Sequence, residues 1–284
     1  MELSLAQREQ FAADGFLVIP NFKSAADIAE LRARAEQIVE AFDERERMPI
    51  FTTADERTKN DEYFLTSGST IRCFFEADAF NAQGRLAQSK ALSINKIGHA
   101  MHDLDPVFAR FAHDARLEDV AAGVGLQRPL VYQSMYIFKQ PGIGGEVRWH
   151  QDATYFVTEP ISVTTFWFAL EAADTTNGCL WVEPGGQRGP LRERFTVDAA
   201  NGAVLERIDP TPWPENANAV PVEVDPGTLV VFGGLLPHYS APNRSPRSRH
   251  AFTLHAVDAS APYAPTNWLQ RAAEFPARGF AVSA

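Results

Sequence analysis

Hydrophobic and polar residues follow a helical spacing soon after the start of the chain. Ser24 can cap a helix with Asp27 at its third position, and apolar residues then recur at steps of three and four. The recurring residues are Ile28, Leu31, Ala35, Ile38 and Phe42. This pattern predicts an amphipathic helix that packs one buried face on the outside of a sheet.

The other elements before residue 129 are marked by apolar runs and by breaker residues. The pattern predicts short helices at 5–13, 90–102 and 105–122, strands at 15–20 and 70–75, and a polar loop or lid at 45–61. Pro106 fits the first turn of its helix, and Gly123 with Gly125 ends that helix. We interpret this part of the chain as structural support.

Beyond Pro129 the pattern changes to short strands rich in β-branched and aromatic residues. The predicted strands are 131–138, 163–170, 179–182, 228–232 and 249–257. Many short strands separated by turns, with no helices between them, predict a mainly β protein with flanking helices and a double-stranded β-helix (jelly-roll or cupin-like) core. We expect one domain over 1–284, with helical support and first strands in 1–128 and the jelly roll in 129–260. The proline-rich stretch 184–221 is predicted to be an irregular insertion in that core.

Composition and charge limit the kinds of partner. With 45% hydrophobic and 22% charged residues the chain is typical of a globular protein, and no apolar run approaches the ~20 residues of a membrane span. A net charge of -10 disfavours nucleic acid or an anionic membrane as the main partner. Two isolated cysteines and the lack of a recognisable targeting signal lead us to expect a cytoplasmic protein.

Candidate chemistry lies in Trp149-His150-Gln151-Asp152, after a glycine-rich turn. Residues two apart on an extended backbone point the same way, so His150 and Asp152 can hold one ion together. His238 follows a predicted strand and a Gly-Gly-containing turn, where a barrel opens. The three residues are typical of the two-histidine, one-carboxylate face of non-haem Fe(II), which leaves three coordination positions open. A 2-oxo acid and O2 need open positions, whereas a structural zinc site closes its coordination.

The predicted strand that begins at Arg249 has two distinct faces. Phe252 and Leu254 share one face, and Arg249, Ala251, Thr253 and His255 share the other. The second face is small and polar and carries one guanidinium, whose planar fork suits a carboxylate. It therefore resembles the wall of a cavity that binds a carboxylate, and His255 is a candidate to support a metal ligand.

Several longer motifs resemble the phytanoyl-CoA dioxygenase family of Fe(II)/2-oxoglutarate oxygenases, and within it the domain-containing protein subgroup. They are DGFLVIPNF, YFLTSGSTIRCFFE, SINKIGHAMHDLDPVF, QSMYIFKQPGIGGEV, WHQDATYF, NGCLWVEPGG and RSRHAFTLH. The resemblance covers nearly the whole chain. It implies that the catalytic and metal-binding residues are His150, Asp152 and His238.

The same resemblance implies a site for 2-oxoglutarate. The residues it places around this co-substrate are Lys96, Met135, Trp167, Ser240 and Arg249. Gln133 is added as a further neighbour because it shares a strand face with Met135. Related halogenases carry a small residue in place of the metal carboxylate, so Asp152 favours hydroxylation. No motif for the CoA part of a thioester is apparent.

The predicted function is therefore that of an Fe(II)- and 2-oxoglutarate-dependent dioxygenase. It would hydroxylate an unidentified small molecule with O2 and release succinate and CO2. One alternative is a zinc hydrolase that uses the same ligands and a metal-bound water. Another is a jelly-roll module that binds metal and 2-oxoglutarate without turnover.

Overall fold

The computed structural model describes residues 1–44, 48–53, 61–198, 202–214 and 218–281. Its α-helices are α1 (Leu5–Asp14), α2 (Ala25–Ala41), α3 (Glu62–Leu65), α4 (Met101–Leu104), α5 (Pro106–Ala112) and α6 (Ala115–Gly123). Its first strands are β1 (Phe16–Ile19), β2 (Ile50–Phe51), β3 (Ile71–Glu76), β4 (Ile94–His99), β5 (Pro129–Ile137), β6 (Val147–His150) and β7 (Thr164–Ala169). The others are β8 (Leu180–Val182), β9 (Glu193–Asp198), β10 (Gly202–Arg207), β11 (Val220–Val222), β12 (Leu229–Gly233), β13 (His238–Ser240) and β14 (Ala251–Asp258).

Two sheets, antiparallel except for the pair β2-β3, form the centre of the molecule. The major sheet has eight strands in the order β1-β12-β7-β14-β5-β4-β3-β2, and the minor sheet has four in the order β11-β8-β13-β6. From β5 to β8 and from β12 to β14 the chain alternates between the two sheets. This alternation is the winding of a jelly roll, as the strand pattern predicted. A third, two-stranded sheet is the hairpin β9-β10.

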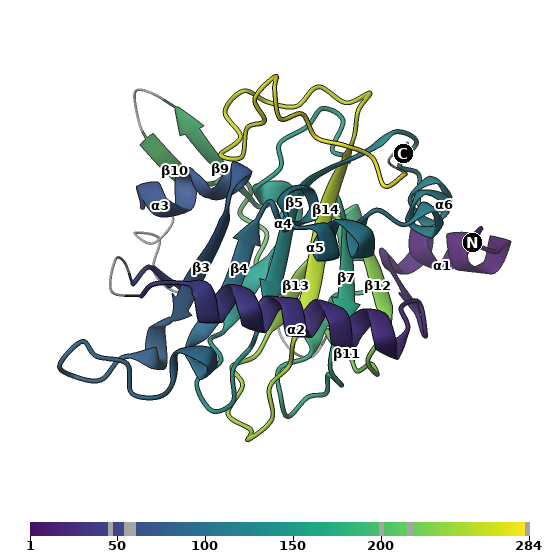
Figure 1. Cartoon of the computed structure of the whole chain (residues 1–284). Coiled ribbons are helices and arrows are strands. Elements are labelled where there is room, and N and C mark those ends of the chain that lie inside the picture. Colours follow the sequence, from purple (N-terminus) through teal and green to yellow (C-terminus); the bar gives the residue numbers. More distant parts are fainter. Residues whose placement is uncertain (45–47, 54–60, 199–201, 215–217, 282–284) are drawn as a thin grey trace.

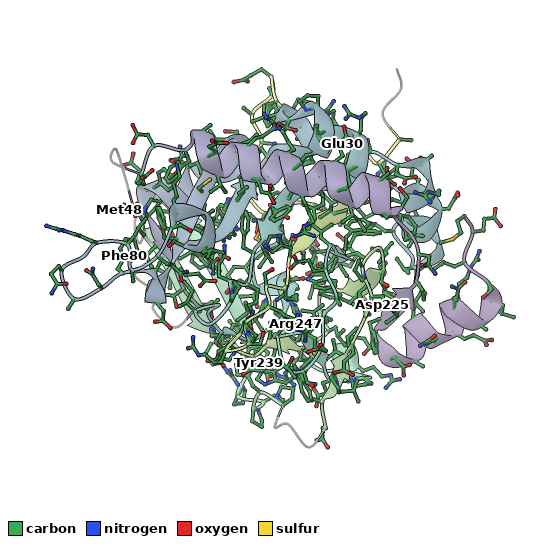
Figure 2. The ribbon with its side chains drawn as sticks, turned by 60° about the horizontal axis from the view of Figure 1, so that its bottom comes forward. Glu30, Met48, Phe80, Asp225, Tyr239 and Arg247 are labelled. Carbon is green, nitrogen blue, oxygen red and sulfur yellow. The ribbon has the colours of Figure 1, made fainter. Side chains whose placement is uncertain are left out.

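Helices cover the outer face of the major sheet, where α2 runs across the strands (Figure 1). Ser24 and Asp27 form the predicted capping box, and the helix buries Ile28, Leu31 and Ala35. Glu30 on α2 and Tyr239 on β13 lie on opposite sides of the molecule (Figure 2). The order of layers is therefore helices, major sheet and minor sheet. Within the described residues, no helix has the length and apolar character required to cross a bilayer.

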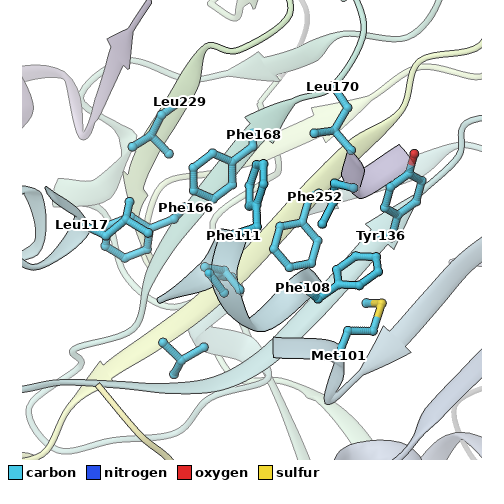
Figure 3. Close-up of a cluster of buried hydrophobic side chains, with 14 of the residues drawn as sticks. Met101, Phe108, Phe111, Leu117, Tyr136, Phe166, Phe168, Leu170, Leu229 and Phe252 are labelled. Atoms are coloured by element: carbon cyan, nitrogen blue, oxygen red, sulfur yellow. The ribbon is translucent and has the colours of Figure 1, made fainter. Parts of the chain in front are cut away.

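The main hydrophobic core fills the space between the helices and the major sheet (Figure 3). Phe252 of β14 is fully buried there, with its ring centroid 5.3 Å from that of Phe108 and 5.6 Å from that of Phe111, both on α5. Leu254 belongs to the same cluster, whereas Ala251 packs between the two sheets. The two faces of β14 are thus divided as its sequence predicted.

Two predicted helices differ from the structure. The helix expected at 90–102 is wrong, because Ile94–His99 forms strand β4 between β3 and β5. Its apolar residues recur at intervals of three, but pairing with two neighbouring strands outweighs this local pattern. The helix expected at 105–122 is divided into α5 and α6, and Asp114 caps the second one.

The two stretches interpreted as irregular also contain strands. Ile50–Phe51 lies within the expected loop 45–61 and pairs in parallel with Phe75–Glu76, while much of that loop lies outside the described residues. The insertion 184–221 carries the hairpin β9-β10 and, from Val220, the start of β11. Phe195 of this hairpin packs in one cluster with Phe64 and Trp268.

Candidate metal centre and co-substrate cavity

Two histidines meet where β6 and β13 pair in the minor sheet. His150 and His238 are direct cross-strand partners, and their ring centroids are 4.0 Å apart. Strand β6 ends at His150, and Asp152 begins a short 3-10 turn, so the expected fully extended His-x-Asp does not occur. The turn still brings the carboxylate in: Oδ1 of Asp152 lies 3.6 Å from Nε2 of each histidine.

The backbone fixes which nitrogen of each histidine faces this cluster. Nδ1 of His150 lies 2.8 Å from the carbonyl of Arg148, and Nδ1 of His238 lies 3.1 Å from the carbonyl of Leu236. A carbonyl only accepts, so each Nδ1 must donate a proton. Each Nε2 is then left with its lone pair toward Asp152, which is the form in which a neutral imidazole binds metal.

Burial and neighbouring charge set the protonation states that a metal needs. Burial, with the nearby His150, lowers the pKa of His238 to about 4, so its imidazole is neutral at pH 7. Burial alone would raise the pKa of Asp152, but the surrounding imidazoles hold it well below its usual range. A neutral imidazole and an ionised carboxylate are ready to bind a cation.

The second oxygen of Asp152 is held by side chains from the major sheet. The hydroxyl of Thr165 on β7 donates to Oδ2, and Nε2 of His255 on β14 lies 3.6 Å from the same oxygen. Oδ1 is left to face the two histidines. Thr165 was not identified from the sequence. It lies two residues before Trp167, so strand periodicity places both side chains on the same face, and this could have identified Thr165 as a candidate.

The three residues fit a metal ion. Among the described residues, ligand atoms of His150, Asp152 and His238 all lie within 4.8 Å of one another. The donors are two nitrogens and one carboxylate oxygen, a set typical of a non-haem iron face with open positions. A cavity of about 380 Å³ opens beside His150 and Asp152 and provides room at those positions.

Arg249 is buried between the two sheets, two residues before the start of β14. It is 1% exposed, and its Nε donates to the carbonyl of Gly178 at 3.0 Å. Nη2 donates to the hydroxyl of Ser240 at 3.2 Å. Nη1 is buried and has no hydrogen-bond partner among the described residues. Burial lowers the pKa of Arg249 to about 10, so the guanidinium is still charged at neutral pH. An incompletely paired buried charge of this kind indicates a missing anion.

The structure brings the other expected co-substrate residues to the same inner face of the major sheet. Met135 and Trp167 flank Thr253 from β5 and β7, and the Trp167 ring centroid lies 5.5 Å from Cζ of Arg249. Nζ of Lys96 lies 3.9 Å from Sδ of Met135 and 3.3 Å from the ring centroid of Phe51. Lys96 on β4 and Arg249, just before β14, are therefore separated by β5 in the same sheet.

Gln133 lies at a different level of the wall from Arg249. It pairs with His255, whereas Met135 pairs with Thr253 and Ile137 with Ala251, the residue nearer to Arg249. Gln133 also lines the cavity, together with Lys96 and Met135. Gln133 therefore lies on the same strand face as Met135, as expected, and its role beside 2-oxoglutarate stays a prediction.

Comparisons with known proteins give the same result as the motifs. Residues 11–251 match the family described as phytanoyl-CoA dioxygenase (PhyH). The chain is 44% identical over 262 residues to phytanoyl-CoA dioxygenase 1 of Oryza sativa subsp. japonica, covering 92% of each chain. It is 40% identical to phytanoyl-CoA dioxygenase domain-containing protein 1 of Bos taurus, covering 96% of this chain and 97% of that one.

Solved structures with lower identity share the fold. The carbocyclase SnoK of nogalamycin biosynthesis, a non-haem alpha-ketoglutarate-dependent enzyme, is 19% identical with a TM-score of 0.65, covering 97% of this chain and 96% of its own. EctD from S. alaskensis, crystallised with 2-oxoglutarate and 5-hydroxyectoine, is 22% identical with a TM-score of 0.64, covering 99% and 87%. The predicted jelly-roll class is confirmed. The chain belongs to the phytanoyl-CoA dioxygenase family and is a non-haem Fe(II)- and 2-oxoglutarate-dependent dioxygenase.

Proposed function

We propose that His150, Asp152 and His238 bind the iron and that Arg249 binds the distal carboxylate of 2-oxoglutarate. The observation that carries this assignment is the buried Nη1 of Arg249, which has no partner in the described part of the chain. A hydrolytic zinc site has no use for such a guanidinium, whereas a dicarboxylate co-substrate does. Ser240 supports the arginine, since its hydroxyl accepts from Nη2 and donates to the carbonyl of Gly178.

Lys96, Met135 and Trp167 complete the proposed co-substrate site. Lys96 of β4 and Met135 of β5 line the cavity, and Trp167 of β7 flanks Thr253 on the side away from Met135. The Lys96 ammonium adds a second positive charge beside the aromatic ring of Phe51. This placement supports a dianion lying between the metal ligands and Arg249.

The residues of this chain bind, orient and shield the reactants. The iron, when bound, supplies the activation of O2 that is coupled to oxidative decarboxylation of 2-oxoglutarate to succinate and CO2 and to oxidation of a substrate C–H bond. Thr165 and His255 keep Oδ2 of Asp152 occupied, which leaves Oδ1 for the metal. Aromatic side chains at the cavity, such as Phe156 and Trp268, limit access of water.

We further propose that the substrate is a small molecule and that the protein works in the cytoplasm. The cavity of about 380 Å³ must hold both 2-oxoglutarate and the reacting part of the substrate, so that part is small. Both cysteines are buried and free, as is usual in a reducing compartment. The net charge of -10 argues against nucleic acid or an anionic membrane as partner.

Succinate formation tests the assignment of the metal ligands. Protein reconstituted anaerobically with Fe(II) and then given 2-oxoglutarate and O2 should form succinate above a metal-free control, even without a substrate. Asp152→Ala should form none. Glu30→Ala is the matched control, because this carboxylate lies on the exposed surface of α2 and should not change the yield. Equal succinate from Asp152→Ala and the unmodified protein would refute the role of Asp152.

The choice of metal separates this function from zinc hydrolysis. Zinc is expected to occupy the same ligands, so metal content alone does not discriminate between the two. Activity should return with Fe(II) and not with Zn(II). Succinate formed equally with zinc would contradict the proposed reaction.

A further inference from the structure

Two buried polar side chains lie next to the metal site, and one of them has unused hydrogen-bonding capacity. Gln133 is 5% exposed and His255 is 4% exposed, and they are direct cross-strand partners on β5 and β14. Nδ1 of His255 is buried and has no hydrogen-bond partner among the described residues, and Gln133 lies beside it on the same strand face. Both residues line the cavity. Buried polar groups are nearly always paired, so the unpaired imidazole nitrogen of His255 indicates a ligand.

The pair lies beside the metal ligand Asp152 and several residues along β14 from Arg249. His255 is at the metal, with Nε2 3.6 Å from Oδ2 of Asp152. Arg249 precedes it by six residues, and the strand part of that stretch, from 251 to 255, spans about 13 Å at ~3.3 Å per residue. A co-substrate that bridges the metal and Arg249 therefore extends away from Gln133. The polar pair is left free for a second molecule.

Aromatic side chains line the same cavity as Gln133 and His255. The Phe156 ring stacks on His255, with centroids 5.1 Å apart and planes at 17°. Trp268 stacks on Phe64 at 4.6 Å, and both line the cavity. Apolar walls with one small polar group are typical of sites that orient a small organic ligand.

We propose that Gln133 and His255 form the polar anchor for the substrate that is oxidised, and that this substrate is a small, neutral, mainly apolar molecule with a hydroxyl group. A hydroxyl both donates and accepts, so it can satisfy the carboxamide and the free imidazole nitrogen together. Acidic and basic side chains line the cavity in equal number, which favours neither an anion nor a cation; they are Glu76, Asp78, Glu146 and Asp152, and Lys96, Lys139, Arg148 and Arg244. This inference rests on the proposed function, because it assigns the substrate side of the same site.

A matched pair of probes tests the anchor without turnover. The full chain is loaded with Mn(II) and 2-oxoglutarate, and benzyl alcohol or toluene is added. Relaxation enhancement of the probe protons reports only molecules bound close to the paramagnetic Mn(II). We expect benzyl alcohol to bind about three- to tenfold more tightly than toluene, which corresponds to the net contribution of one or two neutral hydrogen bonds.

Two variants of Gln133 have opposite expected results. Gln133→Met keeps the shape of the side chain and removes its hydrogen bonds, so the preference for benzyl alcohol should fall to about twofold or less. Gln133→Glu keeps an acceptor in the same position and should retain the preference. Benzyl alcohol binding no better than toluene to the unmodified protein, or an unchanged preference in Gln133→Met, overturns the proposal.

Titration of 2-oxoglutarate into the same Mn(II)-loaded samples separates this inference from the proposed function. If the unmodified protein binds no 2-oxoglutarate, the proposed function fails, whatever the probes do. If Gln133→Met loses 2-oxoglutarate affinity as strongly as it loses the probe preference, Gln133 belongs to the co-substrate site and the anchor proposal is wrong. An affinity within about twofold of the unmodified protein supports the anchor.

Discussion

Replacing Arg249 by methionine removes a guanidinium and keeps an unbranched side chain. Nε and Nη2 of Arg249 are already used by Gly178 and Ser240, so Nη1 is the donor left for a carboxylate. A hydrogen bond from a charged donor contributes about 1.5–3 kcal/mol. Because ~1.4 kcal/mol is a tenfold change in a binding constant, the dissociation constant for 2-oxoglutarate should rise about ten- to a hundredfold in Arg249→Met.

Calorimetric titration of 2-oxoglutarate into Mn(II)-loaded protein measures this change directly. Ser240→Ala is the graded control, because it removes a neutral hydroxyl that contacts Nη2 and leaves the guanidinium in place. Its expected loss is about 0.5–1.5 kcal/mol, or roughly two- to tenfold in affinity. The affinity for Mn(II) alone should be the same in both variants, since neither residue supplies a ligand atom.

The same substitution should not destabilise the metal-free protein. Arg249 is a buried charge with an unpartnered donor, and replacing such a group by an apolar one is often neutral or stabilising. Thermal unfolding of Arg249→Met should therefore occur at or above the temperature of the unmodified protein. The assignment of Arg249 is refuted if Arg249→Met binds 2-oxoglutarate within about twofold of the unmodified protein.

Three further predictions concern the metal ligands, acid stability and the core. Thr165→Val removes the hydroxyl that donates to Asp152 and should weaken Mn(II) binding by about ten- to a hundredfold, measured by calorimetry; unchanged binding would contradict a role in orienting the carboxylate. Burial lowers the pKa of His99 well below its usual value and that of His250 to about 4, so between pH 6.5 and 4 the folded protein binds fewer protons than the unfolded chain. Urea unfolding of the metal-free protein should therefore show stability falling as the pH drops from 7 to 5, and a constant or rising stability would refute this. Phe252→Ala should cost about 3–5 kcal/mol in urea unfolding, because its ring is fully buried against two other phenylalanines, and a loss below about 1 kcal/mol would contradict that packing.

The division of β14 shows what could be predicted from the sequence. Alternation with a period of two assigned Phe252 and Leu254 to one face and Arg249 and Thr253 to the other, and the structure has the first pair in the helix-covered core. Such alternation is reliable because the two faces of this strand meet different surroundings. The jelly-roll class followed from the number and spacing of such strands.

Strand β4 shows which feature of the fold could not be predicted from the local sequence pattern. Ile94, Ile97 and Met101 have helical spacing, yet Ile94–His99 is a strand, because β3 and β5 supply hydrogen bonds on both of its edges. Those partners are distant in sequence, so no window around residue 96 contains the information. The inward position of Lys96 at the cavity depends on this pairing, and only the family resemblance pointed to it.

Thr165 was missed for a related reason. Its hydroxyl acts on Asp152 only because β7 of the major sheet lies opposite the turn after β6 of the minor sheet. Composition gives no sign of this contact, since a threonine in a strand is ordinary. A search for polar residues on the inward face of β7 would have selected it.

The two histidines proposed to bind the metal are oriented by the same kind of hydrogen bond to the backbone. This bond determines which substitutions the site can tolerate. Each Nδ1 donates to the carbonyl two residues earlier, that of Arg148 for His150 and that of Leu236 for His238. Backbone carbonyls persist whatever the side chain, so changes at 148 or 236 leave the tautomers intact. Asp152 has no such protection, because its Oδ2 is contacted by the side chains of Thr165 and His255. The carboxylate is therefore the ligand whose orientation depends on side-chain identity, and substitutions in β7 and β14 should affect it before they affect the histidines.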